Sequence, residues 1–531
     1  MRFRLAFLAA GMVGLVTAAS PSFAQKQGGT LHISHRDNPP SASILEEATI
    51  STVQPFMAVF NNLVMFDPKE KINSPDHIVP DLAESWSWNS DKTQLTFKLH
   101  SGVKWHDGKP FTAKDVKCTW DALAGKSKSD LLRKDPREIW YKNLKEVDVK
   151  SDTEVTFVLN RPQPSFLSML AAGYSPVYAC HADGREMRSK PIGTGPFKVA
   201  EFKRNNSIKL VRNPDYFKKG KPYLDAIEWK IVPSRSTRLL GFVAGEFDMT
   251  FDSDITFPML KDVKSQKPDA VCEARPTGVN GNILLNRDAP PFNNAELRKA
   301  LVLAIDRKPF NEILFEGHAL PAEPMLPPPA GVWGMPKEML ETMPGYGADV
   351  EKNRAEARKI MEKLGYSKDK PLKIKVSTRN IAIYRDPAVI LIDQLKQIYI
   401  EAELEPIDTT VWHTKVQNKQ YTLGMNLTGV GVDDPDVNLY ENFYSTSPRN
   451  YSGYKNPEVD KMIDQQSAEV DHEKRKKMVW EIEKKLIEDG ARPVLYQSVA
   501  NTCWSPKLKG LVLQDNSIYN GWRFEDVWLD R

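Results

Sequence analysis

PDLAESWSWNSDKTQLTFKLHSGVKWHDGKPFTAKDVKCTWDAL is the sequence of residues 80–123, and no other segment says as much about the architecture of this chain. Apolar and polar residues alternate over residues 95–99, which predicts a strand with one buried face. The Asp-Gly pair at 107–108 predicts a tight turn. Thr112 and Asp115 match a capping box, which predicts a helix start. The segment therefore predicts a strand, a turn and a helix around a tryptophan-rich core.

The N-terminus has the pattern of a secretory signal peptide. Arg2 and Arg4 precede an apolar run over residues 5–19, and Ser22-Phe23-Ala24 fits a cleavage site. The run is shorter than the ~20 residues that a membrane-spanning helix needs. We expect residues 1–24 to be a signal peptide and the mature protein to be soluble outside the cytoplasm.

The charge balance excludes a strongly basic surface. The sequence has 73 Lys and Arg against 69 Asp and Glu, and removal of Arg2 and Arg4 leaves 73 − 2 = 71 basic side chains. A near-neutral chain has no electrostatic footprint for nucleic acid, so we expect no nucleic-acid partner. At about 150 residues per domain, the length predicts two to four domains.

Four cysteines, Cys118, Cys180, Cys272 and Cys503, allow three connectivities of two disulfides in an oxidising compartment. Cys118 lies on the apolar side of the expected helix, which favours its interpretation as a packing residue. Cys272 and Cys503 could form a disulfide with each other. The sequence leaves the pairing of the four cysteines open.

The first half of the chain reads as mostly β-structure. Beyond the opening segment, the pattern predicts one helix over residues 53–65, a turn at residues 191–196, and strands at 30–35, 147–149, 155–159, 197–199, 208–211 and 229–231.

The second half alternates strands with helices. The pattern predicts strands at 372–376, 402–407 and 421–427, and helices that begin after Asn294, end at Gly365, begin at Pro387 and cover residues 411–416. Parallel neighbours need a crossover connection, so this alternation predicts a parallel sheet and an α/β half.

Ligands of open α/β sheets bind beyond the carboxyl ends of the strands. In this sequence those ends are residues 378–380, 409–412 and 428–436. The fold argument alone therefore predicts that Arg379, Trp412, Asp433 and Asp434 line a ligand-binding cleft.

Catalytic and metal-binding motifs are absent from the sequence. It has no GxSxG, HExxH, CxxC or GxxxxGK[ST] pattern. SxxK strings begin at Ser101, Ser367 and Ser452, but neither SDN nor KTG accompanies them. His32 and His35 have no cysteine nearby, which favours a surface or hydrogen-bonding role over metal ligation. We expect no enzyme activity, metal or cofactor.

Five blocks, in this order, resemble the peptide/nickel family of solute-binding proteins of ABC importers. They are the segment 80–123, PIGTGPFKVAEF from Pro191, GEFDM from Gly245, NRDAPPFNNAELRKALVLAIDR from Asn286 and YSGYKNPEVDKMI from Tyr451. The resemblance implies an α/β, two-lobed, periplasmic-binding-protein-like (type II) fold with an extra β-rich domain on the first lobe. It also implies a periplasmic protein that delivers a peptide or other small polar solute to inner-membrane ABC permease subunits, and we expect a monomer.

The resemblance divides the chain into a first lobe over 25–272, with the extra domain at roughly 70–190, a second lobe over 273–490, and a return to the first lobe over 491–531. The crossings between lobes are expected near 273–281 and 491–502, and Asn280 on the first crossing is a further candidate ligand contact.

One departure from the family pattern concerns the substrate. In peptide-binding members an aspartate shortly before an Asp-Pro pair binds the α-ammonium of the ligand, and alignment on Asp434-Pro435 puts Gly431 at that place. Peptides, nickel complexes, oligosaccharides and opines all stay open as ligands. Two other functions also stay open: a secreted hydrolase or transpeptidase, and a binding protein that reports to a sensory receptor.

Overall fold

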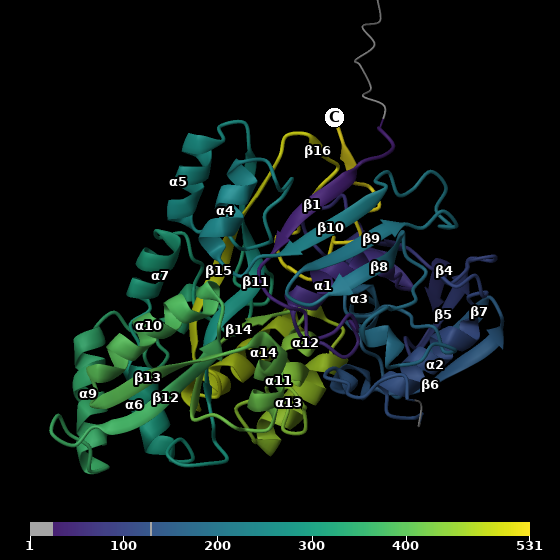
Figure 1. Cartoon of the computed structure of the whole chain (residues 1–531). Helices are drawn as coiled ribbons and strands as arrows, with labels where there is room; N and C mark the ends of the chain where they lie inside the picture. The colour runs from purple at the N-terminus through teal and green to yellow at the C-terminus, as the bar shows by residue number, and fades with distance from the viewer. Residues whose placement is uncertain (1–24, 128–129) are drawn as a thin grey trace, which may run out of the picture.

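Three larger sheets organise the computed structural model, which describes residues 25–127 and 130–531. The expected signal peptide lies outside these residues. Figure 1 shows one sheet at the top, a second at the lower left and a third at the right. We call the surroundings of the top sheet the first lobe, those of the lower-left sheet the second lobe, and those of the sheet at the right the small domain.

The first-lobe sheet has the strand order β1-β10-β9-β8. Its strands are β1 (Thr30–His35), β10 (Ala226–Ile231), β9 (Ser207–Arg212) and β8 (Phe197–Lys203). β1 pairs with β10 in parallel, whereas the other pairs are antiparallel. The predicted strands at 30–35, 197–199, 208–211 and 229–231 are confirmed. Because β1 ends at His35, the residues that follow it leave the sheet at the edge that faces the second lobe (Figure 1).

The small domain is built around the opening sequence segment. Its sheet has the order β4-β5-β7-β6, from β4 (Ala83–Trp88), β5 (Gln94–Leu99), β7 (Glu154–Leu159) and β6 (Leu144–Ser151). Helix α2 (Ala113–Leu123) packs on it and begins with the predicted capping box: Thr112 accepts the N–H of Lys114, and Asp115 accepts that of Thr112. The predicted strand, helix and tryptophan core are confirmed.

Both disulfides are formed in the structure, Cys118 with Cys180 and Cys272 with Cys503. The interpretation of Cys118 as a plain packing residue is therefore wrong. Its helical face also contacts the segment that carries Cys180, because the N–H of Cys180 binds the Asp115 carboxylate one turn before Cys118. That tertiary proximity is not visible in the helical pattern.

The second-lobe sheet has the order β13-β12-β14-β11-β15. It consists of β13 (Ile400–Ile407), β12 (Leu372–Arg379), β14 (Leu423–Gly429), β11 (Val271–Leu285) and β15 (Val494–Trp504). β12 pairs in parallel with both β13 and β14, as predicted from the alternation of strands and helices. β11 adds an antiparallel neighbour on one side of β14, so the complete sheet is mixed.

Amphipathic helices cover this sheet and share one apolar core with it. They are α6 (Ala295–Ala304), α7 (Lys308–Phe315), α9 (Val350–Lys363) and α10 (Ala382–Lys396). Asn294 caps α6 as predicted. The prediction that Pro387 opens a helix is wrong, since α10 begins five residues earlier at Ala382. Burial of Ala388, Leu391 and Leu395 against the sheet offsets the one backbone hydrogen bond that the proline removes.

Strands β11 and β15 are long and connect the lobes. They pair from Val271–Trp504 to Asn282–Val494, with an irregularity between Pro276 and Asn280. The expected crossing near 273–281 lies within β11, and that near 491–502 overlaps β15 from Val494 onward. Cys272 and Cys503 are directly paired residues at the first-lobe end, with Cα atoms 4.1 Å apart.

The helix predicted over residues 53–65 is shorter than expected. Helix α1 (Ile50–Phe56) is followed by one 3-10 turn (Met57–Val59), and strand β2 (Val64–Phe66) already includes the last predicted helical residues. The Val59 carbonyl accepts the N–H of Gly195 at 3.0 Å, so it is not available to continue a helix. The remaining elements are β3 (Ile78–Pro80), α3 (Phe166–Ala171), α4 (Arg235–Val243), α5 (Phe257–Gln266), α8 (Lys337–Leu340), α11 (Thr409–Gln417), α12 (Pro435–Asn442), α13 (Pro457–Ala468), α14 (His472–Glu488), β16 (Leu508–Lys509) and β17 (Trp528–Leu529).

Candidate functional site

A cavity lies between the lobes, where the segment after β1 meets the end of β12. Its volume is about 30 Å³, and since one water needs roughly 10–15 Å³, it has room for about two waters. A larger solute therefore enters only when the lobes separate or the lining side chains move. The lining residues are Arg36, Ala48, Thr49, Ile50, Asp252, Ser253, Thr277, Val279, Arg379, Ile383, Tyr384, His413, Asn426, Leu427, Gly429, Arg449, Tyr451, Ser498, Ile518 and Tyr519.

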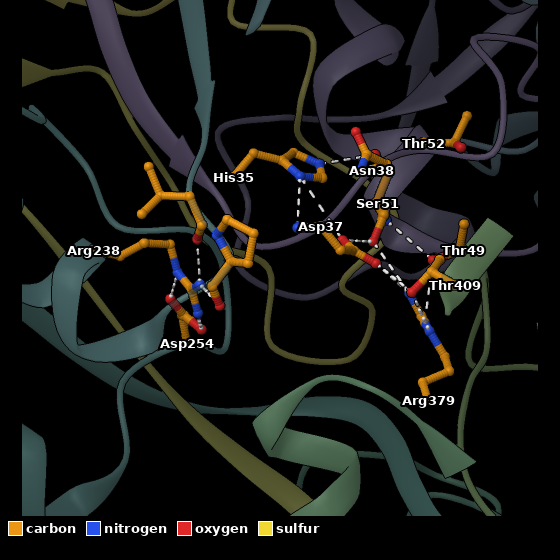
Figure 2. A network of polar contacts seen from close by, with 12 residues as sticks. His35, Asp37, Asn38, Thr49, Ser51, Thr52, Arg238, Asp254, Arg379 and Thr409 are labelled. Atoms are coloured by element: carbon orange, nitrogen blue, oxygen red, sulfur yellow. Dashed lines mark hydrogen bonds and ion pairs between the residues drawn. The ribbon is translucent and has the colours of Figure 1, made fainter. Parts of the chain in front are cut away.

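Arg379, predicted from its place at a strand end, lines this cavity and joins the two lobes (Figure 2). It is the last residue of β12, and its guanidinium is buried. Within the second lobe it donates to Thr409 Oγ1 at 3.1 Å and to the Tyr384 hydroxyl at 2.8 Å. Across the lobes it donates to Asp37 Oδ2 at 2.7 Å. In this structure the lobes are therefore closed and held by a buried ion pair.

Asp37 is the first-lobe partner in this contact. Its Oδ2 also accepts the Thr409 hydroxyl at 2.7 Å, and its Oδ1 accepts the Ser51 hydroxyl at 2.6 Å. Burial alone raises the pKa of this carboxyl, but the Arg379 guanidinium, with His35 and Arg36, outweighs burial and lowers the pKa of Asp37 to about 2. Asp37 is therefore ionised throughout the neutral range, and closure brings its charge opposite Arg379.

His35 supports Asp37 from the end of β1. Its Nε2 lies 3.0 Å from the Ser51 carbonyl, and its Nδ1 accepts the backbone N–H of Asp37 at 3.3 Å, which assigns the proton to Nε2. Burial lowers the pKa of His35 to about 4, so the ring is neutral. The hydrogen-bonding role predicted for this histidine is confirmed.

Trp412 does not line the cavity. Its side chain has no exposed area and packs with Leu284, Ile407, Val416 and Tyr421 in a separate apolar cluster of the second lobe. The next residue of α11, His413, lines the cavity instead. Successive helical residues point about 100° apart, which explains why Trp412 and His413 of the same helix turn face different surroundings.

The acidic loop after β14 is also absent from the cavity lining. Asp434 caps α12 through the N–H of Asp436 and forms a two-point ion pair with Arg475, at 2.9 and 2.7 Å. Asp433 accepts the N–H of Val332 at 3.1 Å, and burial raises its pKa to about 7. These contacts give both aspartates a structural role in the closed arrangement.

Asn280 lies on β11 beside the cavity but is not among the residues that line it. Its side-chain oxygen accepts the amide of Asn282 at 2.7 Å. Thr277 and Val279 of the same strand line the cavity. Successive side chains of a strand point to opposite faces, which places Asn280 on the other face.

Two aromatic rings lie close to Gly431. A Cβ atom there would lie 3.3 Å from the Tyr174 ring and 3.5 Å from the Trp140 ring. A side chain at this position would therefore require the Tyr174 ring to shift by a few tenths of an ångström.

Several residues at the cavity were not predicted from the sequence. The rule that ligands bind beyond the carboxyl ends of parallel strands could have found two groups of them. Arg36 and Asp37 follow β1, which pairs in parallel with β10, so they also stand at the carboxyl end of a parallel strand. His413 follows β13 within the first turns of α11. Ile518 and Tyr519 come from the C-terminal segment, where no periodic pattern indicates a site.

Residues 77–450 match the profile of the "Bacterial extracellular solute-binding proteins, family 5 Middle", which is more than half of the chain. The chain belongs to this family. A relative from Pseudomonas aeruginosa, "Probable di/tripeptide-binding protein 5", is 26% identical over 86% of this chain and 88% of its own length. "Heme-binding protein A" of Haemophilus influenzae is 27% identical over 86% of this chain and 84% of its own length.

The fold of this family member agrees with a solved structure. Haemophilus influenzae OppA in complex with RPPGFSPFR superposes with a TM-score of 0.85 at 21% identity, over 96% of this chain and 100% of that one. The α/β, two-lobed, type II periplasmic-binding-protein-like fold is therefore confirmed. No helix among the described residues is both long and apolar enough to cross a membrane.

Proposed function

We propose that this protein is the periplasmic solute-binding component of an ABC import system, that it acts as a monomer without catalysis, and that it delivers a peptide or other small polar solute to inner-membrane permease subunits. The observation that carries the proposal is the interlobe cavity, whose walls come from both lobes and meet at the pair between Arg379 and Asp37. A solute bound between two lobes gains its full contacts only when they close, so binding favours the closed shape. A permease can recognise that shape.

The ligands of the relatives support a small solute and leave its identity open. One curated relative is named for di- and tripeptides, another for heme, and a solved structure holds the peptide RPPGFSPFR. The altered position at Gly431 separates this chain from the aspartate-bearing pattern of peptide binders. We therefore propose a cleft that accepts a solute other than an ordinary free-amino peptide.

Mass spectrometry of the solute released from denatured, purified protein tests the binding function. We expect a small molecule in stoichiometric amount, and its addition back to stripped protein should reduce the radius of gyration in small-angle X-ray scattering. A radius that stays constant at saturating solute would contradict closure. Uptake of the same solute by vesicles that carry the cognate permease separates import from a sensory role.

A further inference from the structure

Arg36 is a buried cation at the cavity that no acidic side chain pairs with at contact distance. It lines the cavity and is only 5% exposed. Among residues 25–127 and 130–531, its Nε is fully covered and has no hydrogen-bond partner, and no carboxylate lies within ion-pair distance of the guanidinium. The guanidinium carbon lies 4.7 Å from the centre of the Phe251 ring, which supports one face of the group but supplies no acceptor.

Among the described residues, the two other guanidiniums that line the cavity each pair with a carboxylate. Arg379 pairs with Asp37 at 2.7 Å, and Arg449 pairs with Glu441. Asp252, the one carboxylate among the described residues that line the cavity, receives Arg275 at 2.7 Å. Behind the wall, Arg238 holds Asp254 through two contacts at 2.5 and 2.6 Å (Figure 2).

Each of these four carboxylates is thus paired with one guanidinium. Among the guanidiniums that line the cavity within the described residues, Arg36 is left without a carboxylate at contact distance. An unpaired buried charge costs several kcal/mol, whereas a charge-assisted hydrogen bond to an anionic oxygen removes most of that cost. The same distribution disfavours an ammonium group in the cavity, because Asp252, the lining carboxylate of the described residues, is already paired with Arg275.

Neutral donors and acceptors complete the polar part of the cavity. His413 lines it, and neither ring nitrogen has a partner among the described residues. Burial, together with the nearby Arg379, Arg449 and Lys134, lowers the pKa of His413 well below its ordinary value. The ring is therefore neutral and can donate one hydrogen bond and accept another.

The adjoining space is apolar. A second cavity of about 50 Å³ shares Ser253, Ile383 and Ser498 with the first. Its other walls are mainly apolar: Ile255, Phe257, Leu314, Phe315, Pro387, Tyr496, Val499 and Ala500. Arg235 and Asp386, which also line it, are paired with each other at 3.2 Å. A group that reaches this space from the first cavity meets hydrocarbon and no unpaired charge.

We propose that the solute of this protein carries an anionic oxygen group, which pairs with Arg36, and an apolar part, which enters the adjoining cavity. The inference rests on the proposed solute-binding function and names the chemical class of the solute. Carboxylates and phosphate esters share the required chemistry. A free ammonium group is not part of it.

The test uses stripped protein and an equimolar mixture of 4-phenylbutyrate, phenylethyl phosphate, 4-phenylbutyramide, 4-phenylbutylamine, glucose and the dipeptide Ala-Phe. Retained compounds are measured by mass spectrometry after rapid gel filtration. We expect retention of the carboxylate or the phosphate, and the one retained more strongly identifies the anion class. Retention of the amine, the dipeptide, the amide or glucose in preference to both anions, or of no member, overturns the inference.

Matched variants separate a ligand contact from a structural role. Arg36→Gln should weaken retention of the anion about 30-fold or more, while Arg36→Lys should retain part of it. Because removal of an unpaired buried charge relieves its desolvation cost, Arg36→Gln should also raise the melting temperature of the stripped protein. Arg204→Gln, at an exposed arginine that lines neither cavity, should change neither quantity.

A lower melting temperature for Arg36→Gln with unchanged retention of the anion would overturn the inference, since it would show that Arg36 is structural. Mass spectrometry of the co-purified solute distinguishes this failure from that of the proposed function. A cationic or neutral solute in stoichiometric amount would overturn the anion inference and leave solute binding intact. A protein that binds no small molecule, either from the cell or from the mixture, would overturn both.

Discussion

Asp37→Asn should shift the lobes toward the open arrangement. The asparagine keeps the shape of the side chain and can still accept from Ser51, but it removes the charge that faces Arg379 across the lobes. Thr409, the other second-lobe donor, then meets either an amide oxygen or an amide nitrogen. The variant therefore weakens the contact between the lobes and leaves each lobe intact.

The size of the effect follows from the pKa of Asp37, which is about 2 in the closed structure against an ordinary value of 3.8. A difference of nearly two pKa units corresponds to about 2.5 kcal/mol in favour of the ionised form. Arg379 is the largest contributor among the groups that lower the pKa. Loss of the charge should thus reduce the ratio of closed to open molecules by up to about 60-fold.

The pH dependence has a definite sign. The pKa of Asp37 is depressed, so its contribution is complete above about pH 4 and is lost as the pH falls toward the closed-state pKa of about 2. Closure of the wild type should therefore not change through this group between pH 5 and 8.

Small-angle X-ray scattering with and without solute measures the shift. Asp37→Asn should keep a larger radius of gyration than the wild type at equal solute concentration. The control is Asp254→Asn, which breaks a buried pair with Arg238 inside the first lobe (Figure 2) and should lower the melting temperature without opening the lobes. If Asp37→Asn closes as readily as the wild type, the pair with Arg379 does not hold the lobes together and the reasoning fails.

Three further predictions concern stability. Gly195→Ala should lower the melting temperature and reduce the free energy of unfolding by about 1–3 kcal/mol, because a Cβ there lies 2.4 Å from the Val59 carbonyl carbon. It should leave solute affinity unchanged. The control in calorimetry is Gly347→Ala, whose Cβ meets no atom of the described residues within 4 Å. Burial raises the pKa of Glu323 to about 8, and that of Glu483 well above its ordinary value, so the free energy of unfolding should fall as pH rises from about 4.5 to 8. Denaturant unfolding at several pH values measures this free energy, and Glu323→Gln should make its fall with pH less steep. An equally steep fall in the variant would argue against a protonated Glu323. Trp412→Ala should reduce the free energy of unfolding by about 3–5 kcal/mol, because it removes a side chain from a buried apolar cluster. The solute affinity from isothermal titration calorimetry at low temperature should not change. A loss of affinity without a loss of stability would show that Trp412 contacts the solute.

The second-lobe sheet was predictable because its causes are local. Apolar periodicity marks β12, β13 and β14 separately, and the helices between them require parallel pairing. The strand-end rule then located Arg379, since the last residue of a strand is fixed by the strand itself. The antiparallel edge of the sheet, by contrast, depends on residues 271–285 and 494–504 meeting across more than 200 positions of sequence.

Trp412, Asp433 and Asp434 lie outside the cavity lining because of contacts that sequence spacing does not encode. Trp412 and His413 differ by one helical step, and only packing decides which one faces the cavity. Asp434 looked available for a ligand, but Arg475, which lies 41 positions later, occupies both of its oxygens. The predicted helix near residue 59 ended early for a comparable reason, because Gly195 takes the backbone carbonyl of Val59.

The pairing of β11 with β15 constrains how the two lobes can move. The strands are in regular register between Val271 and Pro276, where the Cys272–Cys503 bridge also joins them, and the register breaks before pairing resumes at Asn280. A pair of strands bends most easily where the hydrogen bonds between them are interrupted. The two crossing strands should thus bend together, at the segment without regular pairing, which contains Thr277 and Val279 of the cavity wall. Sliding of one lobe past the other would break the hydrogen bonds of the paired section, so bending at the unpaired section is the favoured motion.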